Sequence, residues 1–294
     1  MKRITSILAA AVIAVLSLSP LAAQAPVFES LRNSAAGVSQ FQVPLPEASV
    51  LFNAPRAEGR ELSGEALFDY LHETTVPAPR LQPSYKASKA FMYSKADNSG
   101  CGGRPGVLTF YSQVCVPGSS DTGDSYKESG DSNGDGVVDS FINAEHIWPQ
   151  SYFKSALPMV ADLHHLAPTF VTPNGRRGNL KFSRVARATY ATSAGSKLGS
   201  GGFEPADAVK GNVARAMFYF IVRYSDRNIR QGMNYSEFWT ANVRMLLEWN
   251  RQDPPDAAER RRNALVEEFQ GNRNPFIDEP ELAERISAEV FMAH

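Results

Sequence analysis

The residues of this chain that could carry out acid–base and metal-assisted chemistry gather between Asn143 and Phe182. They are a glutamate next to a histidine, a pair of histidines, and a short run with two amides and two arginines: Glu145 and His146, His164 and His165, and Asn174, Arg176, Arg177 and Asn179. One short segment therefore supplies a base, oxygen ligands for a metal ion, and cations that bind phosphate.

Hydrolysis of a phosphodiester needs an activated water, a Lewis acid and cations for the developing negative charge. His146 can be the base, and because it must be neutral to accept a proton, activity is expected to rise through its pKa, about 6.5 if unperturbed. Glu145 and Asn174 offer carboxylate and amide oxygens, which suit Mg²⁺, Mn²⁺ or Ca²⁺ better than Zn²⁺. Arg176 and Arg177 can fork onto phosphate oxygens.

Each of these residues also has a purely structural interpretation. His164 or His165 could equally be a buried, hydrogen-bonded imidazole. Adjacent residues of an ideal strand point to opposite faces of the sheet. Glu145 and His146 can therefore share a site only at a strand end or at an irregular turn.

The rest of the sequence predicts the elements that must position these groups. Ser63 is a good helix cap and Pro77 a terminator, with apolar residues at helical spacing between them. Two segments rich in aromatic and β-branched residues indicate paired strands, and three helical patterns follow the central stretch. The strands are expected at residues 90–96 and 106–114, and the helices at 206–227, 236–249 and 256–271.

Four segments, in order, carry a resemblance to a known family. They are NAEHIWPQSYF, DLHHLAPTFVTPNGRRGN, FEPADAVKGNVARAMFYFIVRY and QGNRNPFID. They resemble successive motifs of the bacterial endonuclease I family, exported non-specific nucleases with a ββα-metal (His-Me finger) core. The similarity covers roughly residues 62–280, and four ordered motifs are far more specific than any single pattern.

The resemblance implies an α+β fold in which a ββα unit around residues 142–181 lies within one helix-rich nuclease domain, residues 60–294. It implies that His146 is the general base and that Glu145 and Asn174 hold one catalytic Mg²⁺. The implied reaction is endonucleolytic hydrolysis of DNA, with RNA as a further candidate substrate, leaving 5′-phosphate ends. Contacts of this kind fall on the nucleic-acid backbone, so no base readout is expected.

The resemblance also assigns supporting residues. His164 matches a family position, while His165 and Asn179 are expected to support the site from behind it. Some relatives place a transition-state arginine in an insertion after the base, whereas here Lys154 is the one basic residue in that segment. Lys154 or Arg177 is expected to take that role.

The segment DSNGDGVVD resembles a calcium-binding loop. Oxygen-bearing residues alternate along it, with Gly136 at the sharp turn. Counted as an EF-hand loop, its ligand positions are Asp131, Asn133, Asp135, Val137 and Asp139. The position of the usual bidentate glutamate is Ile142, so a standard EF-hand is not expected. A structural Ca²⁺ site and a solvated turn both remain open.

The N-terminus predicts export. Residues 1–25 have a basic start, a short apolar run and a small-residue close, which is typical of a cleaved signal peptide. A membrane anchor is disfavoured because the apolar run is shorter than about 20 residues. Residues 26–59 are interpreted as an irregular extension. The mature chain is expected in the periplasm or medium, as a monomer that does not associate with the membrane.

Cysteine content and charge set further bounds. In an exported chain, Cys101 and Cys115 predict a disulfide, since the CxxC pair of a typical zinc site is absent. Removing Lys2 and Arg3 from the 30 basic residues leaves 28 against 31 acidic ones, a formal charge of −3. A uniformly basic nucleic-acid binder is excluded, so any phosphate-binding surface must come from local clustering.

Two rival functions remain at this point. One is a secreted calcium-dependent binding module without catalysis, which would use the loop at residues 131–139. The other is a zinc hydrolase using His146, His164 and His165, although the HExxH spacing is absent.

Overall fold

A three-stranded antiparallel sheet and one buried helix organise the part of the chain that the computed structural model describes. The described residues are 56–57, 60–77, 82–118, 126–130, 136–137 and 140–294. All of them belong to one unit, residues 50–294. The expected signal peptide and most of the expected extension lie outside the described residues.

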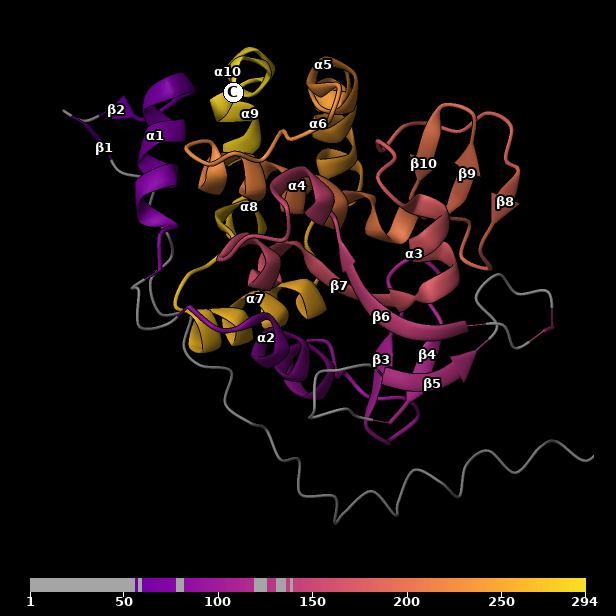
Figure 1. The fold of residues 1–294 in the computed structure, drawn as a ribbon. Helices are drawn as coiled ribbons and strands as arrows, with labels where there is room; N and C mark the ends of the chain where they lie inside the picture. Colours follow the sequence, from indigo (N-terminus) through magenta and orange to yellow (C-terminus); the bar gives the residue numbers. More distant parts are fainter. Residues whose placement is uncertain (1–55, 58–59, 78–81, 119–125, 131–135, 138–139) are drawn as a thin grey trace, which may run out of the picture. The chain divides into compact units, whose positions relative to one another are not determined.

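The central sheet has the strand order β5-β6-β7. Its strands are β5 Tyr126–Gly130, β6 Ser140–His146 and β7 Leu166–Phe170. β6 and β7 run antiparallel in unbroken register, from Ile142 opposite Phe170 to His146 opposite Leu166. Helix α3, Val171–Arg177, begins directly after β7 and packs against β6 (Figure 1). Two strands and a helix therefore lie together between Ser140 and Arg177.

Helix α4, Lys210–Tyr224, forms the centre of the core. Every side chain from Val213 to Tyr224 is buried. A helix that is enclosed on all sides needs neighbours on all sides. Those neighbours include α1 Gly64–Thr74, α6 Val243–Gln252, α8 Pro275–Asp278 and the 3₁₀ turn η5 Leu163–His165. Because η5 leads directly into β7, the core helix supports the sheet.

The remaining elements are short, apart from one long helix. The helices are α2 Tyr85–Phe91, α5 Tyr235–Phe238, α7 Ala257–Gln270, α9 Leu282–Ile286 and α10 Ala288–Ala293. The strands are β1 Arg56–Ala57, β2 Arg60–Glu61, β3 Gly106–Leu108, β4 Cys115–Pro117, β8 Tyr190–Ala191, β9 Lys197–Gly199 and β10 Gly202–Glu204. Helices combined with small antiparallel sheets make an α+β fold, as expected.

Helix α7 follows its sequence signals closely. The Asp256 carboxylate accepts a hydrogen bond from the Glu259 backbone N–H at 2.7 Å, and the helix ends at Gly271 with φ +83°. A carboxylate cap and a left-handed glycine are both local signals. The helix predicted at residues 236–249 is instead divided into α5 and α6. The Asn242 side chain bonds the carbonyl oxygens of Glu237 and Phe238, which ends α5.

The strand predicted at residues 90–96 is wrong. This segment is the end of α2, continued by a π-helical turn, η2, at Met92–Ala96. Ser84 caps α2 through a 3.2 Å hydrogen bond from the Ala87 N–H, and alanine and lysine favour the helix. The segment at 106–114 is a strand only over β3, which pairs with β4. Aromatic content misled the prediction because these aromatic residues pack from a helical segment, with the Phe91 ring stacked on Phe269 of α7 at 4.2 Å between centroids.

The predicted disulfide between Cys101 and Cys115 is confirmed, with 5.7 Å between the Cα atoms. It lies beside the β3–β4 pair, where an added Cβ at Gly106 would meet the Cys101 sulfur at 2.3 Å. Glycine is therefore required at that position. Among the described helices, none combines the length and the apolar character that a membrane crossing requires.

Candidate active site

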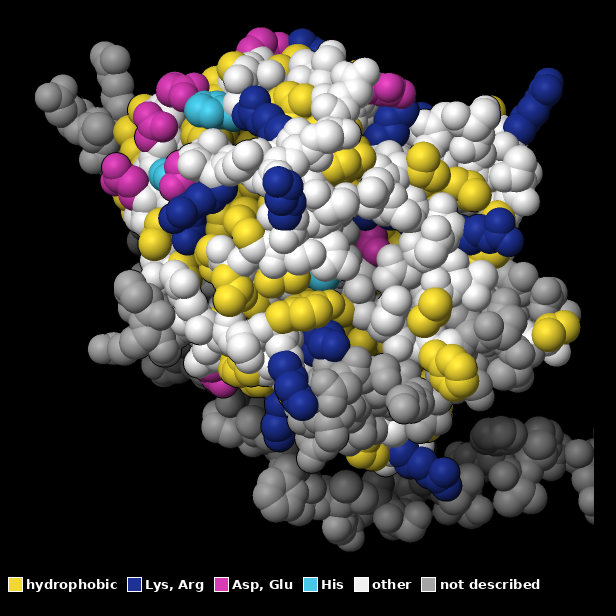
Figure 2. Space-filling view, in the orientation of Figure 1, with side chains coloured by type: hydrophobic (Ala, Val, Ile, Leu, Met, Phe, Trp, Pro, Cys, Tyr) yellow, Lys and Arg dark blue, Asp and Glu magenta, His cyan; other side chains and the backbone are white. Residues whose placement is uncertain are grey.

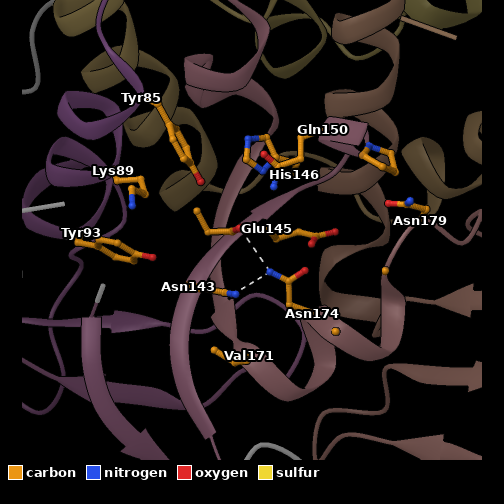
Figure 3. Close-up of a pocket in the computed structure, with 14 residues that line it drawn as sticks. Tyr85, Lys89, Tyr93, Asn143, Glu145, His146, Gln150, Val171, Asn174 and Asn179 are labelled. Carbon is orange, nitrogen blue, oxygen red and sulfur yellow. Dashed lines mark hydrogen bonds between the residues drawn. The ribbon is translucent and has the colours of Figure 1, made fainter. Parts of the chain in front are cut away.

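A pocket of about 400 Å³ lies beside the end of β6. Glu145 and His146, the last two residues of that strand, both line it, together with Asn174 and Asn179. Adjacent residues of a regular strand point to opposite faces of the sheet. Glu145 and His146 can line one pocket because both lie at the end of the strand. Figure 3 shows these residues around one space, with Glu145 and His146 between helix α2 and helix α3.

Glu145 is held from behind by two donors. The Tyr111 hydroxyl donates to Oε1 at 2.7 Å, and the Arg177 guanidinium donates to the same oxygen at 2.9 Å. The glutamate is 2% exposed. Burial raises the pKa of its carboxyl, while the arginine charge and both hydrogen bonds act in the opposite direction. Both of these hydrogen bonds are made to Oε1, so Oε2 carries the remaining acceptor capacity of the carboxylate.

Arg177 lies behind Glu145 and is itself completely buried. Its guanidinium also donates to the carbonyl oxygens of His146 at 2.9 Å and Ile147 at 2.6 Å, and it stacks on the Phe182 ring at 4.5 Å. Arg177 does not line the pocket. This position suits a residue that fixes the end of β6, and it does not suit the direct phosphate contact expected from the sequence.

His146 is oriented by the backbone. Its Nε2 lies 3.1 Å from the Val160 carbonyl oxygen, so Nε2 carries the proton and Nδ1 is the acceptor in the neutral ring. Burial lowers the pKa of His146 to about 3, and the charges of His165, Arg177 and Lys89 act in the same direction. The unperturbed pKa assumed from the sequence therefore does not apply. The imidazole is neutral throughout the physiological pH range, as a general base requires.

Asn174 reaches the pocket from α3. Its amide nitrogen donates to the Asn143 side-chain oxygen at 2.7 Å and to the Ala144 carbonyl oxygen at 3.3 Å (Figure 3). With both donor contacts made to β6, the amide oxygen is the group left for a ligand. A carboxylate oxygen and an amide oxygen lining the same pocket form a hard donor set of the kind that binds Mg²⁺, Mn²⁺ or Ca²⁺.

His164 and His165 do not line the pocket. His165 donates from Nε2 to the Met159 carbonyl oxygen at 2.6 Å, and its ring packs against His146 at 5.5 Å between centroids. His164 bonds the Asn272 carbonyl oxygen at 3.0 Å. Since His146, His164 and His165 are directed at three different carbonyl groups, they do not converge on one ion. In the described part of the chain no group of three His, Cys, Asp or Glu side chains could hold a metal ion.

Asp162 joins the histidine segment to the core. Its Oδ2 accepts 2.7 Å hydrogen bonds from the Tyr219 and Tyr224 hydroxyls, and its Oδ1 accepts from the Gln270 amide at 2.8 Å. The Asn272 amide also donates to the Tyr219 hydroxyl at 2.7 Å. Three of the four sequence motifs thus meet at one buried carboxylate, which explains why they occur together.

The other expected site residues have different positions. The Asn179 side chain lines the pocket, and its carbonyl oxygen accepts a bond from the Tyr152 hydroxyl at 2.9 Å. Lys154 is exposed, in the left-handed region with φ +52°, and is not part of the pocket lining. Of the expected calcium ligands, Val137 is 60% exposed, while Asp131, Asn133, Asp135 and Asp139 lie outside the described residues.

Two contributors to the site were not found from the sequence. Tyr111 lies 34 residues before its partner Glu145, and Asp162 gathers donors from helix α4 and from the C-terminal motif. Neither pairing has a local spacing rule. For Asp162 the sequence offered one indication of importance, because it is the first residue of the DLHHL segment. Tyr111 had none beyond its place in an aromatic stretch.

The fold and the pocket define an α+β protein with a carboxylate, an imidazole and an amide at the edge of a strand–strand–helix unit. A family model described as endonuclease I matches residues 66–281. This chain belongs to the endonuclease I family, and the predicted resemblance is confirmed.

Curated relatives extend this finding. The extracellular ribonucleases of Bacillus amyloliquefaciens and Bacillus subtilis are each 41% identical over 165 residues, covering 52% of this chain and 56% of theirs. A periplasmic deoxyribonuclease of Aeromonas hydrophila is 32% identical over 128 residues, covering 41% of this chain and 48% of its own. The chain spans about half the length of the curated relatives it matches.

Proposed function

We propose that this protein is an exported, metal-dependent endonuclease that hydrolyses phosphodiester bonds without base specificity. The observation that carries the proposal is the convergence of Glu145, His146 and Asn174 on one pocket at the end of β6. Each group has a distinct chemical capacity, namely a carboxylate oxygen, a neutral imidazole and an amide oxygen. Membership of the endonuclease I family supports the same reaction.

The donor set fits a divalent cation, with Mg²⁺ as the expected ion. Glu145 and Asn174 would hold it, because the hydrogen bonds at Oε1 and at the amide nitrogen leave one oxygen of each side chain for coordination. When bound, the cation supplies Lewis-acid stabilisation of the phosphate and of the leaving oxygen. A hydrated ion with few protein ligands is typical of Mg²⁺ sites.

His146 would act as the general base through Nδ1. It takes a proton from water as the water oxygen bonds to phosphorus, and the bond between phosphorus and the 3′ oxygen breaks. The leaving 3′ oxygen takes up a proton from solvent water, so the products are a 5′-phosphate and a 3′-hydroxyl. Because the Val160 carbonyl holds Nε2, the ring has one orientation in which Nδ1 accepts.

Arg177 would be a positioning residue in this reaction. It ties the Glu145 carboxylate to the backbone of His146, so the metal ligand and the base keep a fixed relation. Orientation of the groups that hold a metal is a known determinant of metal affinity and activity.

RNA is proposed as a substrate beside DNA. The relatives with higher identity are named ribonucleases, while those near 30% identity are named deoxyribonucleases. Their names also include the words extracellular or periplasmic, which supports export together with the predicted signal sequence. Backbone-directed binding accepts either nucleic acid.

The test is incubation of the purified mature chain with supercoiled plasmid and, separately, with labelled RNA, each with Mg²⁺ or EDTA. We expect nicking and linearisation of the plasmid and cleavage of RNA only with Mg²⁺. The plasmid products should be ligatable, since ligase requires the 5′-phosphate. Absence of cleavage of both substrates at millimolar Mg²⁺, by protein with a cooperative unfolding transition, would overturn the proposal.

A further inference from the structure

The wall of the pocket facing Asn174 is built by helix α2 and the π-helical turn that follows it. Tyr85, Lys89 and Tyr93 line this wall. Figure 3 shows all three on the side of the pocket away from α3, with Lys89 between the two tyrosines. The sequence motifs do not include this helix, and it is also the segment whose secondary structure was predicted wrongly.

Lys89 is the one Lys or Arg residue among the described residues that line the pocket. The other candidate cations are directed elsewhere. Arg177 is buried behind Glu145, Lys154 is exposed outside the lining, and Arg176 stacks on the Tyr190 ring at 5.5 Å. Phosphodiester hydrolysis builds negative charge that a nearby cation stabilises. The pocket therefore offers one side chain for that purpose.

Ring contacts place Lys89 close to the base. Its ammonium nitrogen lies 5.0 Å from the centroid of the Tyr85 ring, and that ring lies 5.4 Å from the His146 ring between centroids. The lysine is half-buried, so its charge is less screened than on an open surface. Figure 2 shows a histidine near the centre of this face among hydrophobic side chains.

A run of three backbone carbonyls fixes the helix relative to the base. This run is η4, Met159–Ala161. Its carbonyl oxygens accept in sequence from His165 Nε2 at 2.6 Å, from His146 Nε2 at 3.1 Å, and from the Ser88 hydroxyl at 2.6 Å. Ser88 is the residue before Lys89. Consecutive carbonyls thus anchor both the base and the helix that carries the lysine.

We propose that Lys89 is the catalytic cation of this site and contacts a non-bridging oxygen of the scissile phosphate. This inference rests on the proposed function. The Tyr85 ring supports the ammonium from the side through a cation–π contact, and the η4 carbonyls set its distance from His146. The transition-state role that the sequence assigned to Lys154 or Arg177 is thereby taken by a lysine that precedes the base in the sequence.

The test compares Lys89→Gln and Lys89→Arg with wild type under single-turnover conditions at saturating substrate and Mg²⁺. We expect Lys89→Gln to lower the cleavage rate by about 10²- to 10³-fold, the usual loss for one transition-state donor. Lys89→Arg restores the charge and should recover at least tenfold over Lys89→Gln. The Mg²⁺ concentration for half-maximal activity and the melting temperature should stay near wild type for both variants.

Lys95→Gln is the matched control. Lys95 lies one helical turn and a half further along the same segment, is exposed, and is outside the pocket lining. Lys95→Gln removes the same charge as Lys89→Gln, so it measures how much a positive charge near the pocket contributes by attracting the nucleic acid in general. Its cleavage rate should stay within threefold of the wild-type rate.

The possible failures are distinguishable. A wild-type protein without cleavage overturns the proposed function, and with it the role of Lys89. An active wild type combined with a Lys89→Gln rate within threefold of it overturns the inference alone. Equal losses in Lys89→Gln and Lys89→Arg, or equal losses in Lys89→Gln and Lys95→Gln, overturn it as well, because neither pattern depends on a charge at this position in the pocket.

Discussion

Replacing Arg177 by methionine separates its two expected roles, phosphate contact and internal support. Methionine keeps a long apolar side chain that can still cover the Phe182 ring, but it removes every donor. Three acceptors lose their partner, namely the Glu145 carboxylate and the carbonyl oxygens of His146 and Ile147. The substitution therefore tests the support without opening a large cavity.

The expected loss of stability is large. The Arg177 and Glu145 side chains are 1% and 2% exposed, so the glutamate would be left as a buried charge without its partner. Breaking a buried ion pair from one side costs about 3–5 kcal/mol of unfolding free energy. For a domain of this size each kcal/mol lowers the melting temperature by about 2–4 °C, so a decrease of roughly 6–20 °C is expected.

Urea and thermal unfolding measure this loss, with Arg176→Met as the control. Arg176 is adjacent and exposed, and its guanidinium stacks on the Tyr190 ring, so the change in unfolding free energy should stay within about 0.5 kcal/mol. At a temperature where Arg177→Met remains folded, the Mg²⁺ requirement should rise because Glu145 is no longer held. Saturating Mg²⁺ should recover much of the activity.

Two results would refute this reasoning. If Arg177→Met unfolds within 1 kcal/mol of wild type, the buried network does not stabilise the fold as the contacts indicate. If stability and Mg²⁺ requirement are unchanged while the maximal rate falls a hundredfold, Arg177 contacts the phosphate, as first expected from the sequence.

Three further predictions concern the base, the metal and acid stability. His146→Ala should lose about 10²- to 10⁴-fold in rate while Mg²⁺ binding and circular dichroism persist; a variant that nicks plasmid at the wild-type rate would exclude it as the base. Asn174→Ala should raise the Mg²⁺ concentration for half-maximal cleavage with little loss of stability, and an unchanged Mg²⁺ titration would remove it from the ligands. Burial lowers the pKa of His165 to about 4, although Asp162 opposes this. The unfolded chain therefore binds a proton below about pH 6.5 that the folded chain does not bind, so the contribution of His165 to stability falls as the pH is lowered, by about 2 kcal/mol from pH 7 to pH 5. Urea unfolding at those pH values should show this loss, and His165→Gln should reduce it; a flat profile would contradict the pKa.

The sequence alone predicted those structural features that depend on interactions between residues close together in the chain. Asp256 and Gly271 bound helix α7 through contacts within one turn. The disulfide followed from two cysteines in a chain predicted to be exported. The neighbouring positions of Glu145 and His146 implied a strand end, and β6 ends there. Ordered motifs also led to the family, because a catalytic unit that is contiguous in sequence keeps its residue types and spacing.

Tertiary structure alone decided the positions of the basic residues. Arg177 and Arg176 are adjacent in sequence, yet one is buried against Glu145 and the other is exposed. No local pattern distinguishes them, since the choice depends on which face of α3 packs on β6. Lys89 reaches the pocket from a helix more than fifty residues before the base, through contacts between Ser88 and η4. Periodicity within a segment can predict its secondary structure. Which charged groups its side chains contact depends on how distant segments pack together in the folded core.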